Sequence, residues 1–388
     1  MGPLQGLRVI ELASIGPGPL CAMLLADQGA DVVRIDRLQP SGLGLDLDET
    51  QDIAARGRRS VALDLKHPDG LAAALALVAG ADVLIEGWRP DVAEKLGLGP
   101  ADCHALNPGL IYGRMTGFGQ TGPLAAAAGH DINYIALTGA LHAIGTAQPG
   151  SPPVPPLNLV GDYGGGALYL AFGVMAALFE RQRSGRGQVV DAAMVDGAAS
   201  LMTLFHGLAA GGGWNTAQRA SNLLDGGAPF YGCYATSDER WVSIGPLEPK
   251  FFAQLAGLIG LPAHFVSSQY RRETWPAMRA ALSSIFASRT RDAWCALLEG
   301  TDACFAPVLD LHEATDHAHA EARGAYLTIN GLRQPAPAPR FGRSVAEVPS
   351  PPPQLGQHTH SVLREAGLSD DHIGRLLASG AARQNPAP

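Results

Sequence analysis

The first two hundred residues alternate between short apolar runs and amphipathic segments. Residues 7–12 and 31–36 have the β-branched, apolar character of strands, and Pro19–Asp27 between them has helical spacing. Further strands are expected at 60–65, 82–86 and 110–115, with helices at 70–78 and 91–95. This alternation of strands and helices predicts a largely parallel α/β sheet.

The second half of the chain has a different pattern. Helical residues dominate from about 165 to 210, interrupted by a short expected strand at 189–194. A new α+β unit begins near Leu224, with a hairpin at 231–234 and 240–244 and helices at 251–260, 275–287 and 291–298, and a last helix is expected at 359–366 near the end of the chain. Pro335–Pro353 reads as an extended strap. The predicted domains are a large α/β domain over 1–200, a linker over 201–224, a small domain over 225–318, and a segment over 319–388 that returns to the large domain.

Composition supports a folded protein with more than one core. A length of 388 residues favours two domains, and 46% hydrophobic against 16% charged residues argues against disorder. The formal net charge of -8 argues against a general nucleic-acid binder. Local arginine and lysine side chains could still bind the phosphates of an anionic ligand.

Cysteine usage and the apolar runs bear on location. The five cysteines form no CxxC pair, which is typical of reduced thiols in a cytoplasmic enzyme. The N-terminus lacks the features of a signal peptide. The longest apolar run, Gly164–Phe179, is short and begins with glycines, so we expect a buried helix and no membrane span.

A glycine-containing turn near the N-terminus is similar to a dinucleotide-binding loop. Gly16–Pro19 follows a strand, opens a helix, and is followed by Asp36 at the end of the next strand. Cys21 stands where the third glycine of that motif belongs, and the two prolines remove backbone N–H donors. These departures disfavour a nicotinamide-dependent dehydrogenase and favour a simple strand-to-helix turn.

Two segments carry candidate proton-transfer groups. His130 lies in Gly129–Tyr134, and Asp162 lies in Asn158–Gly166, before a run of three glycines. Imidazole and carboxylate are suited to moving protons near neutral pH. Taken alone, His130 reads as a packed or surface histidine, and Asp162 as a turn residue or a helix N-cap. A helix start would favour the anionic form of Asp162.

These segments resemble the active-site segments of the alpha-methylacyl-CoA racemases, a branch of the family III CoA-transferase superfamily. The resemblance extends over nearly the whole chain and includes residues 115–122, 191–197, 224–231 and 301–304. It implies a large Rossmann-like α/β domain and a smaller domain joined by long linkers, in an interlocked homodimer. It also implies epimerisation of 2-methyl-branched acyl-CoA esters, with CoA bound as part of the substrate and no further cofactor.

The resemblance assigns roles to individual residues. Racemisation needs one group on each face of the α-carbon, and the residues that match are His130 and Asp162. Glu248, otherwise a solvated loop residue, matches a glutamate that orients the catalytic histidine. Asn158 offers polar support or an ordinary structural hydrogen bond. The residues expected to bind the CoA moiety are Arg37, Ala62, Leu63, Asp64, Leu65, Lys66, Arg89, Gly129, Asp131 and Tyr134.

Two alternatives remain at this point. Transferases of the superfamily use the aspartate that matches Asp162 as a nucleophile, so a CoA-transferase is the alternative activity. The joint presence of His130 and Glu248 favours the racemase, because the transferases generally lack this pair. A non-catalytic CoA-binding protein would bind CoA and exchange no α-proton. The 7 methionines leave the length of the acyl chain open.

Overall fold

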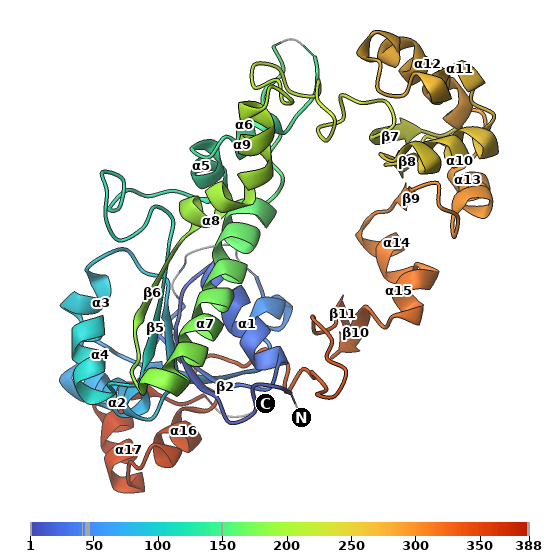
Figure 1. The fold of residues 1–388 in the computed structure, drawn as a ribbon. Coiled ribbons are helices and arrows are strands. Elements are labelled where there is room, and N and C mark those ends of the chain that lie inside the picture. The colour runs from blue at the N-terminus through green and yellow to red at the C-terminus, as the bar shows by residue number, and fades with distance from the viewer. Residues whose placement is uncertain (1, 41, 43–46, 149, 386–388) are drawn as a thin grey trace. The chain divides into compact units, whose positions relative to one another are not determined.

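The structure is a computed structural model that describes residues 2–40, 42, 47–148 and 150–385 (Figure 1). The chain forms two compact units. The large unit comprises Met1–Thr138, Leu157–Met202 and Gly324–Pro388, and the small unit comprises Gly139–Pro156 and Thr203–Arg323. The domain limits expected from the sequence stay a prediction.

The large unit is built on a seven-stranded sheet with the order β12-β3-β2-β1-β4-β5-β6. Its strands are β1 (Arg8–Leu12), β2 (Asp31–Asp36), β3 (Arg58–Leu63), β4 (Val83–Glu86), β5 (Ile111–Thr116), β6 (Val189–Ala193) and β12 (Ala382–Arg383). All pairs are parallel except β12, which runs antiparallel to β3. The predicted α/β class is confirmed. Strand order reverses between β1 and β4, and such a switch point is where α/β sheets bind ligands.

Helices cover both faces of this sheet. Val9 and Ile10 are neighbours in β1 yet belong to different apolar cores, because successive strand residues point to opposite faces. One core includes α2 (Pro68–Ala79), α4 (Pro100–Leu106), α16 (Thr359–Glu365) and α17 (Asp370–Ala378). The other includes α1 (Pro17–Asp27), α5 (Asp131–Ala136), α7 (Leu168–Ser184) and α8 (Met194–Leu201). The short helix α3 (Val92–Lys95) follows β4, and α1 lies beside α7 (Figure 1).

Buried ion pairs fix the start of α1. Arg58 Nε lies 3.0 Å from Glu11 Oε2, and both side chains are fully buried. The Arg58 guanidinium also donates to the carbonyl oxygens of Arg56 and Pro19. Gly16, at the N-cap of α1, has a φ of 72°, a left-handed value that favours glycine. The predicted strand-to-helix turn is confirmed.

A π-helix connects the candidate site to the core. The π-helix η3 (Leu159–Ala167) runs directly into α7, whose residues Leu170 and Val174 are fully buried. Within the described residues, Leu159–Ser184 is the one helical stretch long and apolar enough, by length and composition, to cross a membrane. One face of α7 packs into the core, but Phe172 and Phe179 on its other face are exposed, so the helix that the sequence predicts as buried is buried on one face only.

The small unit has its own antiparallel sheet and apolar core. The strands β7 (Gly232–Ala235) and β8 (Trp241–Ile244) form the predicted hairpin, and β9 (Phe305–Val308), which the sequence did not predict, pairs with β8. Aromatic residues fill the core, among them Phe230, Phe252 and Trp294. Its helices are α6 (Ala140–Ala143), α9 (Thr203–Ala210), α10 (Pro249–Ile259), α11 (Ala263–Ser267), α12 (Trp275–Phe286), α13 (Arg291–Leu298), α14 (Leu311–Asp316) and α15 (Ala318–Ala322).

The returning segment is tied to the large unit by polar contacts. It contains the hairpin β10 (Tyr326–Ile329) and β11 (Leu332–Pro335). Arg56, in a buried ion pair of 2.6 Å with Asp27, donates to Gln334 Oε1 at 2.8 Å and to the carbonyl oxygen of Pro335 at 2.7 Å. These bonds fix the start of the proline-rich strap.

Candidate active site

Asp162 lies beside the turn that follows β1. A Cβ atom placed on Gly16 would be 3.4 Å from Asp162 Oδ2, so the turn passes close to the carboxylate. Gly16 follows β1, and β1 borders the point where strand order reverses. The structure therefore puts Asp162 where parallel α/β sheets bind ligands.

Asp162 does not occupy the helix N-cap position that was one of its two expected places. Asn158 is the N-cap of η3, and Asp162 lies inside the first turn of the π-helix rather than at a cap. Asn158 Nδ2 donates to Asp162 Oδ2 at 3.4 Å. The backbone N–H of Asp162 donates to Asp131 Oδ2 at 2.7 Å. Hydrogen bonds thus fix Asp162, whose carboxyl group is half-buried, through both its side chain and its backbone.

The pKa of Asp162 is raised above its ordinary value, contrary to the expected stabilisation of the anion by a helix start. Burial is the main cause, because it penalises the charged form, and the nearby negative charge of Asp131 adds to it. The hydrogen bond from Asn158 and the charge of His130 act in the opposite direction. A carboxyl group with a raised pKa can donate a proton as well as accept one.

His130 is exposed and directly precedes α5. Its backbone N–H donates to Asn133 Oδ1 at 3.0 Å, so the first turn of α5 fixes the backbone of His130. Asn133 was not predicted to have a role, although an amide three residues after a helix cap is a recognisable signal. Because His130 influences the pKa of Asp162, the two groups lie within electrostatic range of each other.

Tyr134 stabilises the loop that carries His130. The Tyr134 hydroxyl donates to the carbonyl oxygen of Gly129. Its ring packs edge-on against Phe118, with 4.9 Å between centroids and an interplanar angle of 82°. Burial raises the pKa of Tyr134 to about 12, with a smaller contribution from Asp162, so this hydroxyl is a hydrogen-bond donor rather than a base. A Cβ on Gly129 would lie 2.8 Å from the Tyr134 ring, which accounts for the glycine.

The residues expected to bind CoA follow the carboxyl ends of the parallel strands. Arg37 comes directly after β2 and Arg89 shortly after β4, and both are exposed. Lys66, exposed after β3, donates its backbone N–H to Asp64 Oδ1 at 2.9 Å. None of these three cations forms an ion pair within the described part of the chain.

The other expected CoA contacts differ in exposure. Ala62 and Leu63 are buried at the end of β3, and the backbone N–H of Ala62 donates to Thr359 Oγ1 at 3.1 Å. Asp64 and Leu65 are half-buried. Gly129, Asp131 and Tyr134 lie together with His130 around the start of α5.

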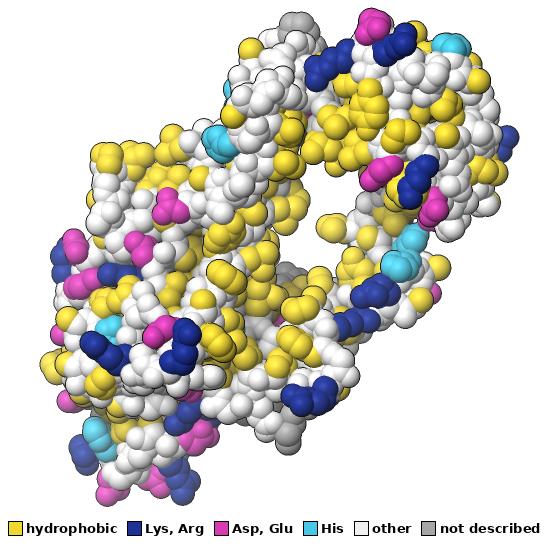
Figure 2. All heavy atoms as spheres, viewed as in Figure 1, with side chains coloured by type: hydrophobic (Ala, Val, Ile, Leu, Met, Phe, Trp, Pro, Cys, Tyr) yellow, Lys and Arg dark blue, Asp and Glu magenta, His cyan; other side chains and the backbone are white. Residues whose placement is uncertain are grey.

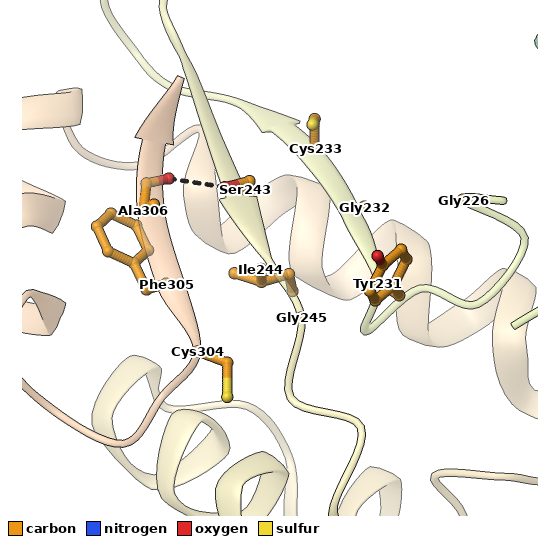
Figure 3. A pocket seen from close by; sticks show the side chains of 10 residues that line it. All are labelled: Gly226, Tyr231, Gly232, Cys233, Ser243, Ile244, Gly245, Cys304, Phe305 and Ala306. Atoms are coloured by element: carbon orange, nitrogen blue, oxygen red, sulfur yellow. Dashed lines mark hydrogen bonds between the residues drawn. The ribbon is translucent and has the colours of Figure 1, made fainter. Parts of the chain in front are cut away.

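Glu248 belongs to the small unit. It is exposed and precedes α10 without capping it through its side chain. Its charge contributes to the raised pKa values of Tyr270 and Cys304, after burial in both cases, so it lies near both side chains. Cys304, Tyr231 and Phe305 line a cavity of about 590 Å³ within this unit (Figure 3).

Comparison with known proteins places the chain in a family. Residues 4–359 match CoA-transferase family III. The chain is 46% identical over 376 residues to alpha-methylacyl-CoA racemase from Mus musculus, which covers 96% of each chain. It is 43% identical over 392 residues to alpha-methylacyl-CoA racemase from Homo sapiens, which covers 98% of each. A CAIB/BAIF family protein from Brucella suis has the same fold, with a TM-score of 0.76 at 26% identity over 94% of this chain and 99% of that one.

The chain belongs to CoA-transferase family III. Both racemase relatives match it nearly end to end, so the resemblance stated from the sequence is confirmed.

Proposed function

We propose that this protein is an alpha-methylacyl-CoA racemase that interconverts (2R)- and (2S)-2-methyl-branched acyl-CoA esters. One observation carries the proposal. In a chain 46% identical to a racemase, an imidazole and a carboxyl group with a raised pKa lie within electrostatic range at the ligand-binding edge of an α/β sheet.

The chemistry is a 1,1-proton transfer. One group removes the α-proton, and the electron pair of the broken C–H bond delocalises onto the thioester oxygen as an enolate. The second group then donates a proton to the opposite face, and the thioester carbonyl forms again. His130 and Asp162 are the proposed pair, each acting as base in one direction and as acid in the other. The raised pKa of Asp162 supports this double role.

Further residues complete the proposed site. Glu248 is the proposed partner of the His130 imidazole, where a carboxylate would fix the tautomer and stabilise the imidazolium. Arg37, Lys66 and Arg89 are proposed to bind the phosphates of CoA, and their exposed positions after β2, β3 and β4 support this role. The CoA moiety arrives as part of the substrate, and the proposed reaction uses no separate cofactor.

A homodimer, interlocked as in the expected architecture, is part of the proposal. Apolar side chains gather on the outer face of α7 (Figure 2), where Leu168, Phe172, Met175 and Phe179 are exposed and recur at helical spacing. Phe172 is 74% exposed, an unusual position for a phenylalanine unless another surface covers it. Sedimentation should give twice the 40.3 kDa chain mass, and a monomer would refute the dimer.

A cytoplasmic location also belongs to the proposal. All five cysteines are free thiols in the structure, and Cys233 and Cys304 are exposed. Exposed free thiols are typical of a reducing compartment. Fractionation of the source cells, with antibody detection, would test this location.

Two matched variants test the function. His130→Ala and Asp162→Asn should each lower epimerisation by about 10²- to 10⁴-fold, the usual contribution of an acid–base group. The dissociation constant of free CoA should stay within about twofold, because neither side chain is assigned to CoA binding. Full epimerisation in both variants would refute the assignment. If Asp162 acts as a transferase nucleophile instead, Asp162→Asn would abolish acceptor-dependent CoA transfer while His130→Ala would not.

A further inference from the structure

Asp131 makes an unusual set of contacts beside the proposed acid–base pair. Its Oδ2 atom accepts the backbone N–H of Gly161 at 2.6 Å and that of Asp162 at 2.7 Å. The residue is only 6% exposed. Its other oxygen, Oδ1, is buried and has no hydrogen-bond partner among the described residues. One carboxylate group therefore receives two short hydrogen bonds from the segment that carries Asp162.

We propose that Asp131 is a positioning residue: its carboxylate holds the backbone of Asp162 at a fixed distance from His130 and keeps a negative charge beside Asp162. This inference rests on the proposed racemase function and gives the Asp131 side chain a role distinct from the expected contact with CoA. Because the side chain is buried and engaged with the protein, it is not available as an exposed contact for a phosphate.

The order of residues along the chain makes Asp131 a direct link between His130 and Asp162. Asp131 immediately follows His130, so a hydrogen bond from the Asp162 backbone to Asp131 couples two segments that are 31 residues apart in sequence. Gly161 is part of the same contact. A Cβ atom there would lie 2.6 Å from Asp131 Oδ2 and 3.2 Å from Ile135 Cγ2, so a larger residue would displace the carboxylate.

The charge of Asp131 matters because the proposed catalytic pair, His130 and Asp162, shares one proton between its two side chains. Transfer in one direction needs anionic Asp162 with protonated His130, and transfer in the other needs protonated Asp162 with neutral His130. An ordinary carboxyl group is far more acidic than an imidazole, so the second form would be rare. Each unit by which the pKa of Asp162 rises increases the share of the second form about tenfold.

Few other charges among the described residues act on Asp162. Burial is the largest cause of its raised pKa, and within the described part of the chain Asp131 is the one charged group that raises it further, while the charge of His130 lowers it. Other titratable side chains on elements packed against η3, among them Cys21 and Tyr134, are not among the causes of this shift. Removing the charge of Asp131 while keeping its shape should therefore make Asp162 more acidic.

The test is the pH profile of α-proton exchange in Asp131→Asn. Asparagine keeps an oxygen that accepts both N–H groups but carries no charge. The acidic limb of the kcat/KM profile should move to lower pH by about one unit, and kcat at neutral pH should fall about tenfold. The dissociation constant of free CoA should not change. Asp82→Asn is the matched control. Asp82, which lies directly before β4, forms an ion pair with Arg181, and removal of its charge should leave the pH of the acidic limb unchanged.

A second variant tests the geometry without changing any charge. Gly161→Ala should displace Asp131 and lower kcat about tenfold or more, with a smaller change in KM. Gly207→Ala is its control, because a Cβ at Gly207 meets no atom within 4 Å. An unchanged acidic limb in Asp131→Asn, or wild-type kcat in Gly161→Ala, would overturn the proposal. Absence of α-proton exchange in the wild-type enzyme would instead refute the proposed function.

Discussion

Asn158 and Asp162 face each other across the first turn of a π-helix, with 3.4 Å between Asn158 Nδ2 and Asp162 Oδ2. This hydrogen bond opposes the effects of burial and of Asp131, which both raise the pKa of Asp162. π-helical turns are rare and are frequently found at functional sites. Here the turn brings the amide of Asn158 to the carboxylate that the proposed reaction uses.

Asn158→Ala should raise the pKa of Asp162 further, because it removes a donor that favours the anion. The acidic limb of the pH–rate profile should move to higher pH, because Asp162 then ionises only at higher pH. Asn158→Asp, which replaces the donor with a second negative charge, should move the limb further in the same direction. A limb that moves to lower pH would contradict this account.

Asp162→Asn should stabilise the protein while it destroys activity. A carboxyl group whose folded pKa is raised favours folding when protonated, and this contribution is lost as pH rises through the folded pKa. The neutral amide avoids that loss. The variant should therefore have the higher melting temperature near neutral pH, and the difference should vanish below the ordinary value of 3.8. Thermal scans over this pH range measure it, and a lower melting temperature at neutral pH would refute the prediction.

Glu11→Ala should strongly destabilise the large unit. It leaves Arg58 fully buried without its partner, and such a change typically costs about 3–5 kcal/mol. Urea unfolding should show a lower midpoint. The matched control is Glu365→Ala, which removes a half-exposed partner of Arg59 and should cost about 1 kcal/mol or less. Equal effects of the two variants would contradict the importance of the buried pair.

The proposed pairing of Glu248 with His130 predicts a non-additive double variant. Glu248→Gln alone should lower epimerisation by about tenfold, as expected for the loss of a charge-assisted hydrogen bond. When His130 is already alanine, the same change should have little further effect, because the side chain that Glu248 supports is gone. Epimerisation rates of the two single variants and the double variant complete the cycle. Multiplicative effects would show that Glu248 acts independently of His130.

Much of the large unit could be predicted from the sequence, because the spacing of apolar residues along the chain indicates which side chains are buried. The strand Asp31–Asp36 was predicted with its observed bounds, and the other parallel strands of the sheet were found within about two residues. Strands β9, β10, β11 and β12 were missed. All four are short, at 4, 4, 4 and 2 residues. They are held by strand pairing, β9 with β8, β10 with β11 and β12 with β3, rather than by an apolar pattern of their own.

The candidate site was only partly predictable. His130 and Asp162 were recognised by residue type and by resemblance to a family. The contact of Asp131 with the backbone of Asp162 was not, because a hydrogen bond between residues 31 positions apart leaves no local pattern. The raised pKa of Asp162 was also missed, because burial outweighs the effect expected of a helix start.

The most direct test is incubation of the wild-type enzyme with one pure epimer of a 2-methyl-branched acyl-CoA in heavy water, without a carboxylate acceptor. Mass spectrometry and chiral analysis should find deuterium at the α-carbon together with the opposite epimer. No exchange in heavy water, with CoA transfer appearing once a free carboxylate is added, would contradict the racemase and identify Asp162 as a nucleophile.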